Sequence, residues 1–190
     1  MLIIGITGTI GAGKGTIVKY LIDKYKFQHF SVRDFLKKQA LDRGISTPDR
    51  DVFTKIANEL REQHSPSYIV DELFQQAIRE GNNAIIESIR SPGEITSLRS
   101  KGKFILLAID ALPEIRYARI SERKSETDHI SFETFIKNEQ REMQSNNPYH
   151  QNLSACISQA DFVIENNGSI EELQYQIDCI FEQLNHRYEN

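Results

Sequence analysis

Cysteine is scarce in this chain of 190 residues, which contains only Cys156 and Cys179. Two cysteines are too few for a disulfide framework or a cysteine metal site, so we expect both to be buried thiols. No apolar run reaches membrane-spanning length, and the first residues lack the basic stretch, apolar core and cleavage site of a secretion signal. We therefore expect a cytosolic protein with no membrane partner.

Positive charge is not in excess either. The chain has 23 Lys and Arg against 27 Asp and Glu, which gives a net charge of −4. This balance disfavours a nucleic-acid partner, although it permits a local basic cleft. None of the five histidines has a partner at catalytic or metal-ligating spacing, so we interpret them as structural or solvated.

Short β-like runs alternate with helical patterns along the chain, which is typical of parallel βαβ units. The expected strands are residues 2–7, 28–31, 84–87, 104–109 and 162–165. They predict an α/β fold with three layers, in which helices cover both faces of a five-stranded parallel sheet. The length fits a single domain, residues 1–190, with one core and an inserted flap.

The clearest motif directly follows the first expected strand. Residues 8–16 read Gly-Thr-Ile-Gly-Ala-Gly-Lys-Gly-Thr and precede a helical pattern. Such glycines let backbone N–H groups turn inward around a polyphosphate, and the lysine reaches its β- and γ-phosphates. The expected ATP-binding residues are Gly8, Gly11, Ala12, Gly13, Lys14, Gly15 and Thr16. The order of strand, loop and helix disfavours the alternative of a glycine-rich turn that binds nothing.

Two segments are longer than simple crossovers. Residues 32–80 are mostly helical and separate the second and third strands. Between the fourth and fifth strands, helical patterns at 113–123 and about 132–144 flank a polar stretch at 124–131, which would suit a mobile flap.

This layout resembles the nucleoside monophosphate kinase family, especially adenylate kinase and its archaeal relatives, and more distantly dephospho-coenzyme A kinase. The resemblance covers nearly the whole chain and is strongest at the phosphate loop, where the Gly-Lys-Gly-Thr ending is typical of small nucleotide kinases. It implies a core of about 1–31, 82–123 and 145–190, an acceptor-binding insertion of about 32–80, and a short lid of about 119–141. The lid contains no cysteine cluster, so the resemblance implies a lid without zinc.

The resemblance places acceptor-binding residues after the second strand. Ser31, Asp34 and Lys37 match the family's spacing, with Lys37 where the family has an arginine. A lysine keeps the charge but loses the bidentate fork. The alternative is that Arg33, Lys37 and Lys38 form one solvated helix face.

Three further residues follow the third strand. A carboxylate at the carboxyl end of a parallel strand lies where ligands bind, so Glu87 is expected to hold Mg²⁺ together with Thr16. Arg90 can fork two phosphate oxygens of the acceptor, although the family more often has Asp-Gly at this strand end and an arginine one residue later. Glu94 either reads a base rich in N–H donors or is an exposed acid at a helix start.

Arg119 and Arg123 stand four residues apart on one helix face, where an anion would relieve their repulsion. In the family such a pair opens the lid and contacts the donor phosphates, and Arg141 is the best match for a further arginine after the lid. The alternative for all three is salt bridging to nearby glutamates. By resemblance, the loop that contains Asn167 borders the donor adenine.

The sequence therefore predicts an ATP- and Mg²⁺-dependent phosphotransferase acting on a nucleoside or deoxynucleoside monophosphate. The expected catalytic residues are Lys14, Arg90, Arg119 and Arg123. Two alternatives remain open. One is a kinase of another small acceptor such as dephospho-coenzyme A, and the other is a nucleotide-dependent regulatory or assembly ATPase with a protein partner.

Overall fold

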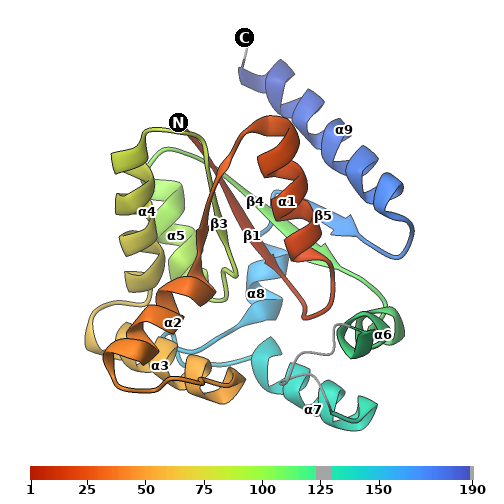
Figure 1. Cartoon of the computed structure of the whole chain (residues 1–190). Coiled ribbons are helices and arrows are strands. Elements are labelled where there is room, and N and C mark those ends of the chain that lie inside the picture. The colour runs from red at the N-terminus through yellow and green to blue at the C-terminus, as the bar shows by residue number, and fades with distance from the viewer. Residues whose placement is uncertain (123–129, 189–190) are drawn as a thin grey trace.

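The structure, a computed structural model, describes residues 1–122 and 130–188, and within them five strands form one parallel sheet (Figure 1). The strands are β1 (Leu2–Gly8), β2 (Gln28–Ser31), β3 (Ala84–Glu87), β4 (Lys103–Asp110) and β5 (Phe162–Glu165). Their order across the sheet is β2-β3-β1-β4-β5, and every neighbouring pair is parallel. The predicted three-layer α/β fold is confirmed, and each predicted strand lies within the observed one.

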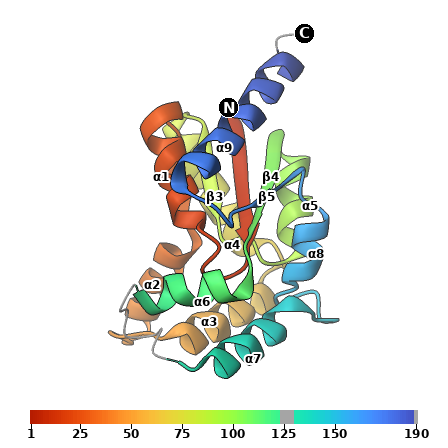
Figure 2. The same cartoon turned by 90° about the vertical axis from the view of Figure 1, so that its right-hand side faces the viewer.

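Helices pack on both faces of the sheet (Figures 1 and 2). On one face lie α1 (Lys14–Tyr25) and α9 (Ile170–Tyr188), and on the other lie α4 (Tyr68–Glu80), α5 (Pro92–Ser100) and α8 (Leu153–Ser158). Neither α5 nor α8 is among the elements predicted from the sequence. Within the described residues, no helix combines the length and apolarity needed to cross a membrane.

The central strand β1 is buried on both sides. Ile3 belongs to the core beneath α4 and α5, whereas Ile4 belongs to the core beneath α1 and α9. A strand covered on both faces reads as a continuous apolar run rather than as an alternating pattern. This is why β1 was recognisable in the sequence.

Four helices lie at the carboxyl end of the sheet (Figures 1 and 2). They are α2 (Val32–Asp42), α3 (Arg50–Gln63), α6 (Pro113–Glu122) and α7 (Phe132–Met143). The segment predicted to be mostly helical, residues 32–80, is formed by α2, α3 and α4. In open parallel sheets ligands bind at this end, so these helices surround the expected binding region.

Candidate active site

The loop from β1 to α1 has a backbone that only glycine adopts without strain. Gly11 has a φ of +78°, and a Cβ atom there would lie 2.5 Å from the carbonyl oxygen of Arg116. Gly13 has a φ of +103°, and a Cβ atom there would lie 2.3 Å from Nδ2 of Asn166. Both glycines are therefore required by conformation and by space. Gly15, in contrast, has an open surrounding and an ordinary φ.

Lys14 is the first residue of α1, and its side chain turns back over the loop. Its Nζ donates hydrogen bonds to the carbonyl oxygens of Gly8 at 2.9 Å and Thr9 at 2.6 Å. Burial, followed by the positive charge of Arg90, lowers the pKa of Lys14 to about 7, although Glu87 acts in the opposite direction. The ammonium group is thus held at the loop, close to the charged groups that follow β3.

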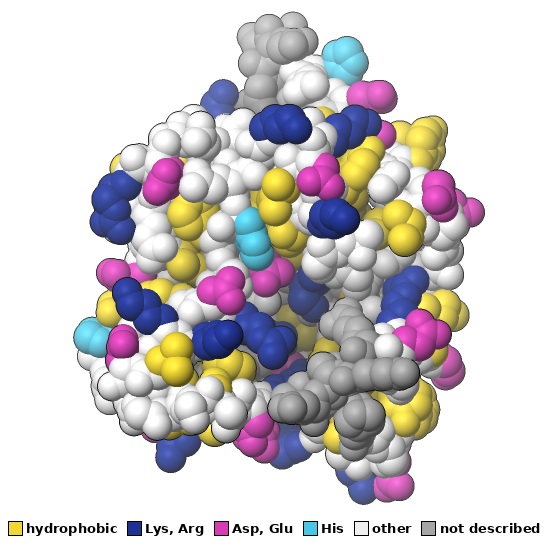
Figure 3. All heavy atoms as spheres, in the orientation of Figure 1, with side chains coloured by type: hydrophobic (Ala, Val, Ile, Leu, Met, Phe, Trp, Pro, Cys, Tyr) yellow, Lys and Arg dark blue, Asp and Glu magenta, His cyan; other side chains and the backbone are white. Residues whose placement is uncertain are grey.

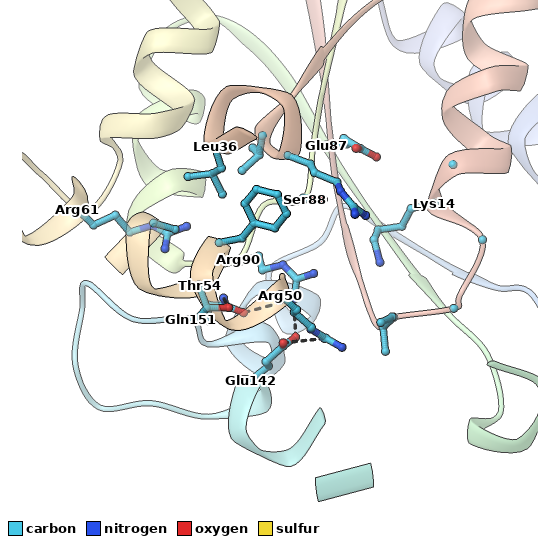
Figure 4. Close-up of a pocket in the computed structure, with 18 of the residues that line it drawn as sticks. Lys14, Leu36, Arg50, Thr54, Arg61, Glu87, Ser88, Arg90, Glu142 and Gln151 are labelled. Carbon is cyan, nitrogen blue, oxygen red and sulfur yellow. Dashed lines mark hydrogen bonds and ion pairs between the residues drawn. The ribbon is translucent and has the colours of Figure 1, made fainter. Parts of the chain in front are cut away.

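A cleft of about 550 Å³ opens beside this loop (Figure 4). Its wall combines the phosphate loop, the end of β3, and side chains from α2, α3 and α7. In Figure 3, Lys and Arg side chains gather around the hollow in the lower half of the molecule. An acidic protein therefore contains a locally basic cleft, as the sequence analysis allowed.

Two oxygen donors on the wall could hold Mg²⁺. Thr16 of α1 and Glu87 at the end of β3 both line the cleft. Burial raises the pKa of Glu87, but two neighbouring side chains lower this pKa by more, so it lies below its usual value. These neighbours are His29, whose Nε2 lies 3.7 Å from Oε1 of Glu87, and Lys14. Mg²⁺ typically binds one or two carboxylates plus substrate phosphates. Residues 1–122 and 130–188 contain no cluster of three His, Cys, Asp or Glu side chains that could hold a metal ion by themselves.

Ser88 follows Glu87 and also lines the cleft. Its φ is +66°, in the left-handed region that non-glycine residues seldom occupy. The family resembled here more often has glycine at this position, and the backbone of this turn gives a physical reason for that preference. Ser88 keeps its side chain at a cost in backbone strain.

Arg90, also on the wall, shares a carboxylate with an arginine that the sequence analysis did not identify. Nη1 of Arg90 donates to Oε2 of Glu142 at 2.6 Å and to Oε1 of Gln151 at 3.3 Å. Nη2 of Arg50 lies 2.6 Å from the other oxygen of Glu142. Burial raises the pKa of Glu142, while Arg90 and Arg50 lower it by more, so this carboxylate is held ionised.

Of the basic residues that begin α2, Arg33 and not Lys37 lines the cleft. The guanidinium carbon of Arg33 lies 5.7 Å from the ring centroid of Phe53, which lines the cleft from α3. Ser31 is the N-cap of α2, and its hydroxyl accepts a hydrogen bond from the backbone N–H of Asp34. Asp34 and Lys37 are exposed outside the wall. Arg33 is exposed as well, as the solvated-face alternative expects, but unlike Lys37 it lines the cleft.

The structure does not place Glu94 where it could read a base. Glu94 is fully buried at the start of α5, where it forms a capping box with Ser91. One oxygen accepts hydrogen bonds from Arg61, and the other accepts from the backbone N–H groups of Arg90 and Ser91. The alternative of a helix-start acid describes its place in α5, but the expected exposure is wrong.

Arg119 and Arg141, two of the expected lid residues, do not line the cleft. Arg119 is half-buried on α6, and Arg141 is exposed on α7, where it hydrogen-bonds to Asn138. Arg123 lies outside the described residues. The structure therefore leaves the lid roles of these arginines as predictions.

The loop after β5 contacts the phosphate loop through a neighbour of the expected residue. Nδ2 of Asn166, which is buried, donates to the carbonyl oxygen of Ala12 at 2.7 Å. The side chain of Asn167 accepts instead from the backbone N–H of Leu112. Asn166 therefore stabilises the phosphate loop by a hydrogen bond, while Asn167 does so for the loop that precedes α6.

Arg116 of α6 makes a second stabilising contact with the phosphate loop. This buried side chain donates to the carbonyl oxygens of Ala111 and Ile10 and forms an ion pair with Glu139 of α7. Arg116 was not predicted as a site residue, because nothing local to the sequence distinguishes it from Arg119 on the same helix.

Comparisons with known proteins agree with this architecture. The AAA domain family matches residues 4–147. A UPF0200 protein of Methanocaldococcus jannaschii is 30% identical over 188 residues, which cover 97% of this chain and 91% of that protein. A UPF0200 protein of Methanococcus maripaludis is 29% identical, with coverages of 97% and 98%.

Solved structures with the same fold include kinases. TT1252 from Thermus thermophilus superposes with a TM-score of 0.62 at 19% identity, covering 96% of this chain and 97% of its own. Shikimate kinase from Bacteroides thetaiotaomicron gives 0.59 at 13% identity, with coverages of 95% and 98%. At such identities the likeness shows the fold alone. The chain belongs to the UPF0200 family and contains an AAA domain with the architecture of a P-loop nucleotide-binding protein.

Proposed function

We propose that this protein transfers the γ-phosphoryl group of ATP to the phosphate of a nucleoside or deoxynucleoside monophosphate. The observation that carries the proposal is that Lys14 of the phosphate loop and Arg90 after β3 line one cleft (Figure 4). A donor polyphosphate at the loop and an acceptor phosphate at Arg90 would thus face each other, as in-line transfer requires.

The donor half binds and orients the polyphosphate. Backbone N–H groups of the loop and the Lys14 ammonium hold the β- and γ-phosphates. Thr16 and Glu87 would hold Mg²⁺, whose charge neutralises the phosphate oxygens. Because the pKa of Glu87 lies below its usual value, this carboxylate is available as a ligand at neutral pH.

The acceptor half combines a cation with an apolar wall. Leu36 of α2 and Phe53 of α3 both line the cleft, and Figure 4 shows Leu36 on the side away from Lys14. A flat aromatic ring gains favourable contact against a phenylalanine face. Arg90 lies between this wall and Lys14, which suits a molecule with a planar base at one end and a phosphate at the other.

The lid is proposed from sequence, with one structural observation in support. Nη1 of Arg119 is a buried nitrogen without a hydrogen-bond partner in the described part of the chain. An unpaired buried donor is costly, and a phosphate oxygen would satisfy it. We propose that Arg119 and Arg123 reach the donor phosphates when the lid closes and excludes water.

The test is ADP production by the purified protein with ATP and Mg²⁺, measured without acceptor, with each nucleoside and deoxynucleoside monophosphate, and with dephospho-coenzyme A. We expect one monophosphate to stimulate ADP production strongly and to appear as its diphosphate. Stimulation by dephospho-coenzyme A alone would indicate a kinase of another small acceptor. Slow hydrolysis that no acceptor changes would contradict phosphoryl transfer and favour a nucleotide-dependent regulatory ATPase.

A further inference from the structure

Arg50 and Arg90 converge on the carboxylate of Glu142 from different parts of the fold (Figure 4). Arg50 begins α3, Arg90 follows β3, and Glu142 lies near the end of α7. Each guanidinium has a nitrogen 2.6 Å from one carboxylate oxygen. The carboxylate is mostly enclosed, with its side chain 14% exposed. An anion thus already occupies the point where the two arginines meet.

The carboxylate of Glu142 does not accept hydrogen bonds from all the donors of the two guanidinium groups. Nη2 of Arg50 is a buried nitrogen whose contact with Glu142 lacks the geometry of a hydrogen bond, and no other group in the described residues accepts from it. Two guanidinium groups together present ten N–H donors, whereas one carboxylate has two oxygens. A phosphate group offers three oxygens and a larger charge, so it fits this pair of cations better.

We propose that Arg50 and Arg90 together bind the phosphate of the acceptor, and that Glu142 occupies the position of this phosphate until the acceptor arrives. The identity of the acceptor rests on the proposed function, but the oxyanion site and its competing carboxylate rest on the contacts above. Arg50 is thereby a second phosphate-binding residue. Glu142 competes with the phosphate for the two arginines and so lowers the affinity of the site for phosphate.

A second cavity could accommodate the carboxylate of Glu142 after its displacement. This cavity of about 240 Å³ adjoins the main cleft, and Arg50 and Glu142 line both. Its wall includes Asn138, Arg141 and Ser145, together with one further carboxylate, that of Asp51. A carboxylate that turned into this cavity would find a cation and hydrogen-bond donors there, so its displacement from Arg50 and Arg90 need not leave it unpaired.

The experiment measures binding of inorganic phosphate by calorimetry, with saturating ADP present to fill the phosphate loop. The test variants are Glu142→Gln and Arg50→Ala. The first removes the competing charge, and the second removes half of the proposed site. Glu133→Gln is the matched control on α7, because Glu133 is 78% exposed and pairs with Lys137 of the same helix. Arg43→Ala is the matched control for Arg50, because Arg43 pairs with Glu59 at the surface.

We expect Glu142→Gln to bind phosphate about tenfold more tightly and Arg50→Ala about tenfold more weakly, while both controls match the natural protein. Phosphate binding that is unchanged or weaker in Glu142→Gln would overturn the proposal, because Glu142 would then support the site rather than compete for it. Unchanged binding in Arg50→Ala would also overturn it, and this variant serves if Glu142→Gln does not fold. If phosphate binding changes in the variants as expected, but no monophosphate stimulates ADP production, the proposed function would be refuted instead.

Discussion

Arg61 of α3 donates two hydrogen bonds to one oxygen of Glu94 of α5, from Nε at 3.1 Å and from Nη2 at 2.7 Å. Neither side chain is more than 2% exposed. The second oxygen of Glu94 accepts the backbone N–H of Arg90 at 2.7 Å. Glu94 therefore connects the helical insertion to the turn that positions Arg90, although it does not line the cleft itself.

The substitution Glu94→Gln should strongly destabilise the protein. It keeps the size of the side chain but leaves the guanidinium of Arg61 buried without a counter-charge, which costs about 3–5 kcal/mol. The free energy of unfolding, measured by denaturant titration, checks this. Glu59→Gln is the control, since Glu59 lies on α3 and its pair with Arg43 is about one-third exposed on each side. Equal losses in the two variants would refute the structural importance of the Arg61–Glu94 pair.

The binding of ATP should be coupled to proton uptake above pH 7. The pKa of Lys14 in the nucleotide-free protein is about 7, mainly because of burial, so the amine is largely neutral at pH 8 to 9. The phosphates of ATP favour the charged form and raise this pKa on binding, so a proton is taken up and ATP affinity falls as pH rises above 7.

Calorimetry of ATP binding at pH 8 in two buffers with different ionisation enthalpies measures this uptake directly. Lys14→Arg is the control, because its guanidinium stays charged at every pH in the range and has no proton to gain. The same binding enthalpy in both buffers for the natural protein would contradict the prediction.

Replacing Arg90 by alanine should reduce turnover of the acceptor and leave the binding of ATP nearly unchanged. We expect kcat/KM for the acceptor to fall on the order of 10²-fold, because a positioned cation is lost from the transferring phosphates, while ATP affinity stays nearly constant. Steady-state kinetics and a separate ATP titration measure the two effects. Arg99→Ala removes an arginine that pairs with Asp161 at the surface and should change neither. Loss of ATP binding in Arg90→Ala would refute the division of the cleft into donor and acceptor halves.

Most of the fold could be predicted because its signals are local. Four of the strands, β1, β3, β4 and β5, are short apolar runs, and the central β1 is buried on both faces. Helix α8 has only six residues, too few for a repeating apolar pattern, so it was not predicted. Lys14, Thr16, Glu87 and Arg90 were placed near one another because each follows or adjoins a strand end, and parallel strands end at the same edge of a sheet.

The rest of the cleft depends on how distant helices pack. Arg50, Glu142 and Gln151 meet only because α3, α7 and the chain before α8 fold against the end of β3. No spacing in a single sequence indicates that meeting. Lys37 fitted the family's spacing, but Arg33, one turn nearer the start of α2, is the residue that lines the cleft. Family spacing thus located the correct helix but a residue one turn too far along it.

The last prediction concerns the two described non-glycine residues with positive φ, Ser88 at +66° and Lys26 at +59°. Glycine adopts this conformation without strain, and the gain outweighs its greater freedom in the unfolded chain, so Ser88→Gly and Lys26→Gly should each stabilise the protein by up to about 1 kcal/mol. Lys26 ends α1 and does not line the cleft, which makes it the matched control.

The two variants should differ in activity. Ser88 lies in the turn that fixes Glu87 and Arg90, so a more flexible residue there should raise the KM for the acceptor and lower kcat, whereas Lys26→Gly should leave both constant. Thermal unfolding and acceptor kinetics on both variants check this. Should Ser88→Gly gain stability with unchanged kinetics, the strain at this turn would have no part in positioning the two charged residues. Should it gain stability and lose activity, the strained turn would be the means by which the end of β3 holds a carboxylate and a guanidinium in place around the transferred phosphoryl group.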